Sequence, residues 1–332
     1  MNSFVFCTKE CWPGVDTYLR AIESIVKMTF PGCKTEFFYV PANGFDAGLI
    51  SRLKNDPPDI LFVGGWDLGI RNIIINVNKE KTRTFLAWCS PLSQTDLGME
   101  IPLFLDVANF LKLNMLNYVS VTLKSDYEVL KNIHEGFVHS PICADFHELD
   151  KEKRQNIIKE EGLNCDIFCA PNSRKNIFMQ IMALSAFEDI KVNFNYQKSE
   201  YIETAKRHLK KYKIHPWLKR YEYLEAIQKM DFGMQVSLSE GYNLATAEHM
   251  YYGIPVICSE LFPYIKGNPK MDKLSVKDPT DCSEIRDKIE WITSLEKSER
   301  EAIGRDCHDV IVAFNKNNEN IMSTLLKGIM EG

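Results

Sequence analysis

Short apolar segments alternate with amphipathic segments along the whole chain. An apolar run at 4–8 precedes the segment 15–28, where apolar residues recur at three- and four-residue spacing. The first pattern predicts a buried strand, and the second predicts a helix that buries one face. Because this succession repeats, the pattern predicts an α/β fold in which helices cover a parallel sheet.

The alternation extends over both halves of the chain. In the first half it predicts strands at 4–8, 35–40, 59–64, 84–88, 118–122 and 136–140, helices at 15–28, 49–54, 70–77, 101–116 and 125–133, and a loop at 88–100. In the second half it predicts strands at 166–170, 191–196, 233–238 and 255–259, and helices at 175–187, 202–212, 220–228, 243–252, 282–295 and 297–329.

A charged segment at 148–161 interrupts the alternation and indicates a linker or a solvated helix. The chain has 332 residues, which is about two domains at roughly 150 residues each. We therefore expect two β/α lobes, with a ligand site in the cleft between them.

Charge is distributed unevenly between the halves. The net charge is −5, and residues 1–150 hold all of it, with 13 basic and 18 acidic side chains. This balance argues against nucleic acid as an obligate partner. The exception is the segment 198–220, with eight Lys or Arg against two Glu, interleaved with tyrosine and tryptophan. It is either a solvated surface or a contact for DNA or an anionic membrane.

The composition also bears on location. With 45% apolar residues the chain can fold on its own. Most of the ten cysteines lie inside apolar runs, which favours reduced core thiols in a cytoplasmic protein. No signal-peptide pattern and no apolar run of about 18 residues occur, so no membrane span is expected.

The segment 230–260 contains the most informative pattern. A predicted strand runs into Ser239, Glu240 and Gly241, and a helix follows near Asn243, a residue type that caps helix starts. The helix N–H groups then point toward the crevice at the strand ends, where phosphates bind in parallel sheets. Glu240 and Glu248, eight positions apart, can both face this crevice.

This segment resembles the nucleotide-sugar signature of the retaining glycosyltransferases of family 4, whose motif is two glutamates separated by seven residues. The resemblance implies the GT-B fold, in which two Rossmann-like β/α/β lobes face a central cleft. The resemblance implies that Glu240 lies beside the donor sugar and that Glu248 binds the ribose. It also implies that backbone N–H groups of Asn243 and Leu244 bind the diphosphate. The donor-binding residues it suggests are Glu248, Gly241, Tyr242, Asn243, Leu244 and Gly14.

Other segments resemble the same family in the expected order. Gly14 stands where the family has a glycine loop near the donor phosphates. The adjacent Arg174 and Lys175 resemble its basic phosphate clamp, so the implied catalytic residues are Glu240, Lys175 and Arg174. The resemblance also divides the chain into an acceptor-side lobe at 1–148, a nucleotide-sugar lobe at 149–305 and a C-terminal helix at 306–332 that returns to the first lobe.

Acceptor recognition is expected in the first lobe. The loop predicted at 88–100 follows a strand, and Ser90, Gln94 and Asp96 have side chains suited to hydrogen bonding with sugar hydroxyls. Trp66 follows another strand and either stacks on a sugar ring or packs its own loop.

The resemblance implies transfer of a sugar from a nucleoside diphosphate, most simply UDP, to an acceptor hydroxyl with retention. No metal or other cofactor is expected, because the basic pair and the helix amides can stabilise the leaving diphosphate. The acceptor is a glycan, a lipid-linked sugar or modified DNA. The alternatives are a transferase that modifies DNA bases through the 198–220 segment, a sugar-nucleotide epimerase or phosphorylase of the same fold, and a degenerate binding module without catalysis.

Overall fold

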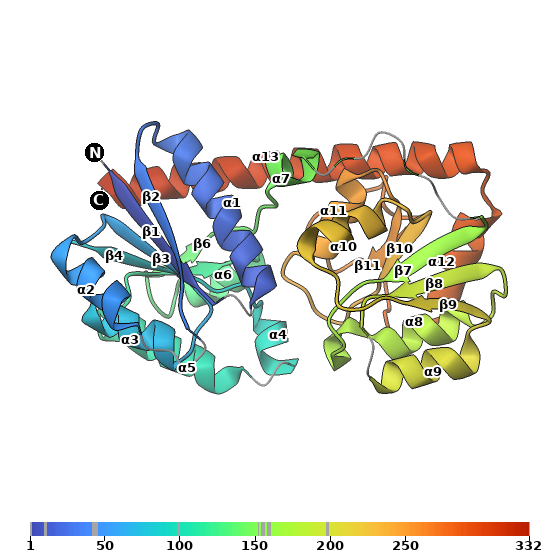
Figure 1. Ribbon diagram of the computed structural model, residues 1–332, viewed down its shortest axis with the longest axis horizontal. Helices are drawn as coiled ribbons and strands as arrows, with labels where there is room; N and C mark the ends of the chain where they lie inside the picture. The colour runs from blue at the N-terminus through green and yellow to red at the C-terminus, as the bar shows by residue number, and fades with distance from the viewer. Residues whose placement is uncertain are drawn as a thin grey trace. The chain divides into compact units, whose positions relative to one another are not determined.

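The computed structural model describes residues 2–9, 12–41, 46–97, 100–151, 153, 157, 161–196 and 199–331. The chain divides into two compact units (Figure 1). The first contains Met1–Asp145 together with Asn315–Gly332, and the second is Phe146–Phe314.

The described strands of the first unit form a parallel sheet in the order β2-β1-β3-β4-β5-β6. These strands are β1 Ser3–Thr8, β2 Lys34–Tyr39, β3 Ile60–Gly64, β4 Arg83–Ala87, β5 Tyr118–Val121 and β6 Phe137–His139. The helices between them are α1 Pro13–Thr29, α2 Ala47–Asn55, α3 Leu68–Asn76, α4 Leu92–Leu97, α5 Ile101–Lys112 and α6 Lys124–Leu130.

Alternate residues of these strands bury the two faces of the sheet, as the strand period requires. Val5 and Cys7 of β1 join one core with α2, α3 and α5, which Figure 1 shows grouped on the same side. Phe4 and Phe6 point to the other face, where the Phe6 and Phe62 rings stack with centroids 4.8 Å apart. Each fully buried phenylalanine contributes about 1.5–3 kcal/mol to folding, so the sheet is anchored on both faces.

The second unit has the strand order β12-β11-β10-β7-β8-β9, also parallel. Its strands are β7 Leu163–Ile167, β8 Ile190–Phe194, β9 Lys211–Ile214, β10 Phe232–Gln235, β11 Val256–Ser259 and β12 Ser275–Val276. Its helices are α7 Phe146–Lys151, the 3-10 turn η1 Ser173–Lys175, α8 Ile177–Leu184, α9 Glu200–His208, α10 Arg220–Ile227, α11 Leu244–Tyr251, α12 Cys282–Ser294 and the first part of α13 Lys297–Glu331.

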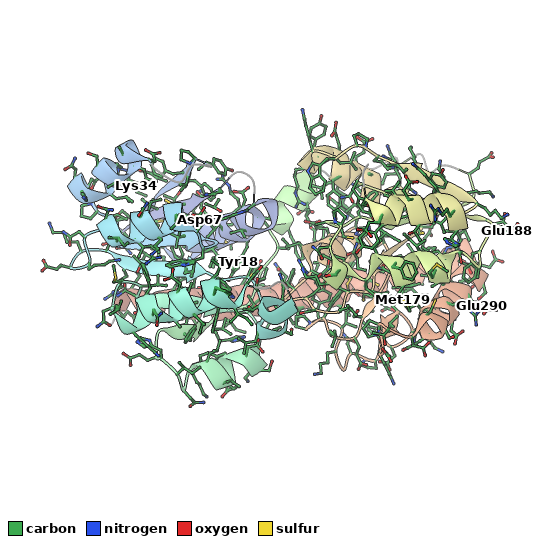
Figure 2. The ribbon with its side chains drawn as sticks, turned by 90° about the horizontal axis from the view of Figure 1, so that it is seen from below. Tyr18, Lys34, Asp67, Met179, Glu188 and Glu290 are labelled. Carbon is green, nitrogen blue, oxygen red and sulfur yellow. The ribbon has the colours of Figure 1, made fainter. Side chains whose placement is uncertain are left out.

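This order is that of a Rossmann sheet. The chain proceeds outward from β7 through β8 to β9, and then returns to place β10 on the other side of β7. The crevice at the carboxyl ends of β7 and β10 is therefore a topological switch point, the usual ligand position in such sheets. Figure 2 shows Met179 of α8 and Glu290 of α12 on the helices that pack together in this unit.

Several predicted elements need correction. The helix predicted at 202–212 ends at His208, because Leu209 turns extended, and 211–214 forms the edge strand β9. Lys211 and Lys213 on this strand are residues that protect sheet edges from further pairing. The loop predicted at 88–100 contains α4, whose first amide, Leu92 N, donates to Asp126 Oδ2 at 2.9 Å. That cap comes from a distant part of the chain, so local sequence could not reveal it.

The second part of α13 packs in the first unit through buried polar contacts. Asn315 accepts from the Ala144 amide at 2.7 Å and donates to its carbonyl oxygen at 3.2 Å. Asn318 donates to the Ile142 carbonyl oxygen at 2.9 Å. The Tyr18 hydroxyl of α1, labelled in Figure 2, lies 2.8 Å from the hydroxyl of Ser140, which precedes Ile142 and Ala144 in the chain.

The described helices include none long and apolar enough to cross a membrane.

A close backbone approach holds the first part of α13 against the turn after α11. Gly253 has a φ of +72°, and a Cβ added at Gly304 would lie 1.9 Å from the Gly253 carbonyl oxygen. We expect Gly304→Ala to lower the free energy of unfolding by about 1–3 kcal/mol, because backbone must move. Urea unfolding measures this change.

Gly328 provides the matched control in the same helix, since an added Cβ there meets nothing within 4 Å. Gly328→Ala should be neutral or stabilising by up to about 1 kcal/mol. Equal stabilities of the two variants would contradict the close approach.

Candidate functional site

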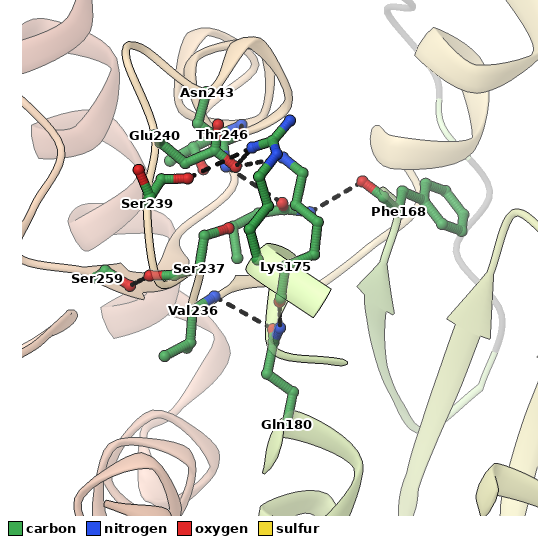
Figure 3. Close-up of polar contacts among 12 residues, drawn as sticks. Phe168, Lys175, Gln180, Val236, Ser237, Ser239, Glu240, Asn243, Thr246 and Ser259 are labelled. Atoms are coloured by element: carbon green, nitrogen blue, oxygen red, sulfur yellow. Dashed lines mark hydrogen bonds and ion pairs between the residues drawn. The ribbon is translucent and has the colours of Figure 1, made fainter. Parts of the chain in front are cut away.

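Two loops at the switch point of the second unit are joined by one side chain, Gln180 of α8. Its amide donates to the Lys175 carbonyl oxygen at 2.8 Å, and its Oε1 accepts from the Val236 amide at 3.2 Å (Figure 3). The Leu238 amide also donates to the Arg174 carbonyl oxygen at 2.8 Å. The loop after β7 and the segment after β10 are therefore held together where a ligand is expected to bind.

Glu240 lies at the centre of this arrangement, only 7% exposed. Its Oε1 accepts from Arg174 Nη1 at 2.9 Å and pairs with Lys175 Nζ; Figure 3 labels Glu240 and Lys175. Burial alone would raise the pKa of Glu240, but Lys175 and then Arg174 outweigh it, so the pKa is lowered. One carboxylate thus balances two cations, which leaves an excess positive charge beside the loop.

The start of α11 adds a second feature suited to anions. Asn243 adopts the left-handed conformation with φ 59°, and its Oδ1 accepts from the Thr246 amide at 3.0 Å. The amides of Leu244 and Ala245 have no partner within the helix by its geometry. Gly241, two residues before Asn243, is buried and is not among the described glycines with a positive φ. The turn into the helix therefore depends on Asn243.

Glu248 is 3% exposed and belongs to α11. Its Oε1 accepts from Arg220 Nη1 at 2.6 Å, which connects α11 with the start of α10. The described contacts thus pair Glu240 with Arg174 and Lys175, and Glu248 with Arg220. Tyr242, another donor-side candidate, is 2% exposed and packs edge-on against Tyr264 with ring centroids 5.3 Å apart.

A buried contact between His249 and Asp166 lies beside this site and was not predicted from the sequence. His249 Nε2 lies 2.7 Å from Asp166 Oδ2 of β7, and its Nδ1 lies 2.6 Å from the Ala245 carbonyl oxygen. Both side chains have 0% exposure. An aspartate inside the apolar strand segment LNCDIFC was the available signal, because a buried carboxylate requires a partner. The partner, 83 residues away, could not be inferred from spacing.

In the first unit, the segment after β1 and the segment after β3 meet. Lys9 pairs with Asp67, and the space beside Gly65 is filled by the ring of Trp12. Gly14 lies in the first turn of α1, where an added Cβ would meet nothing within 4 Å. Trp66 is 5% exposed and donates from Nε1 to Asp106 at 2.9 Å, so its ring packs the loop, one of the two roles expected for it.

The other acceptor-side candidates lie in and before α4. Ser90 precedes this helix and Gln94 lies within it, and both side chains are partly exposed. Asp96 also belongs to α4, but its side chain is outside the part that the structure describes. Ser90 before the helix and Gln94 within it are therefore the two candidates whose side chains are known to be accessible to solvent.

The basic segment, of which 199–220 is described, spans α9, β9 and the start of α10. Trp217 is 61% and Tyr212 38% exposed. Lys206 pairs with Glu203 at 2.7 Å and Lys211 with Asp189 at 3.1 Å. The segment thus presents aromatic and basic side chains to solvent, with part of its charge balanced locally.

Within the described ranges, no cluster of three or more His, Cys, Asp or Glu side chains has the arrangement of a metal site. The side chains at the switch point instead suit an anion, because Lys175 and Arg174 supply positive charge and α11 supplies helix amides.

Comparison with known proteins identifies the fold. No protein-family model matches the sequence, and no curated protein matches it. Among solved structures, sucrose-phosphate synthase from Thermosynechococcus elongatus superimposes with a TM-score of 0.73 at 13% identity, covering 100% of both chains. The UDP-forming α,α-trehalose-phosphate synthase from Burkholderia vietnamiensis gives 0.70 at 11% identity, covering 100% of this chain and 97% of that one.

A mutant of Staphylococcus aureus TarM in complex with UDP gives a TM-score of 0.66 at 11% identity, covering 86% of this chain and 58% of TarM. The architecture of two parallel sheets, each a Rossmann-like lobe, is that of these GT-B proteins. The fold predicted from the sequence is thereby confirmed.

Proposed function

We propose that the chain is a retaining glycosyltransferase that transfers a sugar from a nucleoside diphosphate sugar to an acceptor hydroxyl. The observation that supports this most is the cluster of Glu240, Arg174 and Lys175 at the switch point of the second unit. A leaving diphosphate gains negative charge as the glycosidic bond breaks, and fixed cations stabilise that charge in the transition state. The TM-scores to UDP-forming and UDP-bound proteins make UDP the first nucleotide to test.

In this proposal, Lys175, Arg174 and the amides of Asn243 and Leu244 bind the diphosphate, and Glu248 binds the ribose. Glu240 faces the donor sugar, and the spacing of Glu240 and Glu248 supports our proposal of glycosyltransferase family 4. The excess positive charge of Arg174 and Lys175 over Glu240, together with the helix amides, can stabilise the diphosphate, and we propose that transfer requires no metal. Front-face attack by the acceptor needs no protein nucleophile, in contrast to retaining glycosidases with two carboxylates.

The acceptor is assigned to the first unit. We propose that a sugar acceptor contacts the side chains of Ser90, Gln94 and Asp96. The ring of Trp66 is buried in its own loop and is not part of this proposed contact. The exposed basic segment around Trp217 is a proposed further contact for an anionic acceptor.

A screen of UDP-, GDP-, ADP- and CMP-sugars by thermal shift, followed by mass spectrometry of the products, tests the proposal. We expect a UDP-sugar to raise the melting temperature and to yield a transferred sugar only when an acceptor is present. Conversion of the donor alone would instead identify an epimerase. Absence of a shift with every sugar nucleotide would contradict the proposal.

A further inference from the structure

The ring of His249 lies buried among three elements of the second unit. Nε2 contacts Asp166 of β7, and Nδ1 contacts the carbonyl oxygen of Ala245 in the first turn of α11. On β10, a Cβ added at Gly233 would lie 2.9 Å from His249 Cδ2. Because Gly233 has no side chain, the ring of His249 can occupy the space beside β10.

The two contacts define the protonation of the ring. A carbonyl oxygen only accepts, so Nδ1 must carry a hydrogen, and the Asp166 carboxylate requires a second hydrogen on Nε2. Burial lowers the pKa of His249, but Asp166, the Ala245 carbonyl and Glu248 outweigh it, and the pKa is raised. Tyr223 of α10 also lies in the field of Asp166 and Glu248. The two contacts and the raised pKa therefore both favour the protonated imidazolium of His249 beside Asp166.

The polar environment continues from this pair to Glu248. Asp166 Oδ1 is buried and has no hydrogen-bond partner in the described part of the protein, whereas the buried Tyr223 side chain interacts with Glu248. The ring of His249 is therefore the principal hydrogen-bond partner of the Asp166 carboxylate among the described residues. Losing the ring would leave a buried carboxylate uncompensated.

We propose that His249 is a positioning residue of the nucleotide site, which it fixes by tying the first turn of α11 to β7. Asn243 caps the start of that turn. His249 also directly follows Glu248 in the sequence, so fixing the ring of His249 fixes the backbone next to Glu248. The inference rests on the proposed function for its nucleotide. The contact between His249 and Asp166 then positions both the N-terminal amides of α11 and the Glu248 carboxylate that is proposed to bind the ribose.

Titration calorimetry with UDP tests the role in binding. His249→Gln should weaken UDP binding at least tenfold at pH 7. The matched control is His308→Gln, because His308 Nδ1 donates to the Tyr251 carbonyl oxygen at the other end of α11, at 2.5 Å, without contacting β7. The control should bind UDP within about twofold of the unmodified protein.

The pH profile separates positioning from a purely structural role. The pKa of His249 is raised in the folded protein. The stabilisation that the protonated ring gives to the folded site is therefore complete below the ordinary pKa near 6.5 and is lost as pH rises through the raised pKa. In the unmodified protein, UDP affinity should therefore fall as pH rises through the pKa of His249. Asp166→Asn keeps the shape of the side chain but removes its charge, so the UDP affinity of this variant should not show that fall. This variant also serves if His249→Gln fails to fold.

Hydrogen exchange across 243–252, measured without nucleotide, distinguishes the inference from the proposed function. Faster exchange there in His249→Gln than in His308→Gln supports the positioning role even if UDP fails to bind, an outcome that would refute only the nucleotide assignment. Unchanged exchange, or a UDP pH profile identical in Asp166→Asn and the unmodified protein, would overturn the inference.

Discussion

Lys175→Ala should lower the turnover of sugar transfer by roughly 100- to 1,000-fold, the usual effect of removing one preorganised donor to developing charge. Lys175 is mostly buried, with 11% of its side chain exposed, and it faces Glu240 at the switch point. Its charge matters most when the diphosphate leaves, so turnover should fall further than the apparent affinity for the donor. Steady-state kinetics with the sugar nucleotide found in the screen measures both.

The same substitution leaves Glu240 buried with Arg174 as its remaining ion-pair partner among the described residues. A loss of about 1–3 kcal/mol in stability is therefore expected, and assays should be run well below the measured melting temperature. Lys229→Ala is the control, because Lys229 pairs with Glu225 at the surface, 41% exposed. Turnover of the folded Lys175→Ala protein equal to that of Lys229→Ala would exclude a role for Lys175 in transfer.

Glu248→Gln should weaken nucleotide binding by roughly 10- to 100-fold. A hydrogen bond to a charged group contributes about 1.5–3 kcal/mol, and each 1.4 kcal/mol changes affinity about tenfold. The substitution also replaces the carboxylate that pairs with the Arg220 guanidinium. Calorimetry with UDP and with uridine should show the loss for both ligands, since the proposed contact is to the ribose.

Glu225→Gln supplies the matched control, as Glu225 is 42% exposed and pairs with Lys229. It should bind UDP normally. If Glu248→Gln also binds UDP and uridine normally, Glu248 has only the structural role of holding Arg220.

Much of the fold follows from local pattern. Most strands were predicted within a few residues, because apolar runs such as ILFVG and VICS correspond to β3 and β11. The Asn243 cap was predicted because its effect is local, within the next three residues. The Arg174 and Lys175 contacts with Glu240 are consistent with the phosphate clamp that the resemblance implies, although their roles remain predictions.

What the sequence could not reveal depends on distant partners. The start of α4 is capped by Asp126, and the pair of His249 and Asp166 joins residues 83 positions apart. Edge strand β9 was missed because a helical pattern continues through its lysines. The role of Trp66 was left open for the same reason, since only the fold brings Asp106 within hydrogen-bonding distance of its indole.

A crystal structure of the protein with UDP tests the central claim most directly. The account predicts diphosphate oxygens within hydrogen-bonding distance of Lys175 Nζ and the Arg174 guanidinium, above the first turn of α11, with the ribose hydroxyls at Glu248. UDP bound elsewhere, with Glu240 still holding both cations and Glu248 still holding Arg220, would contradict it.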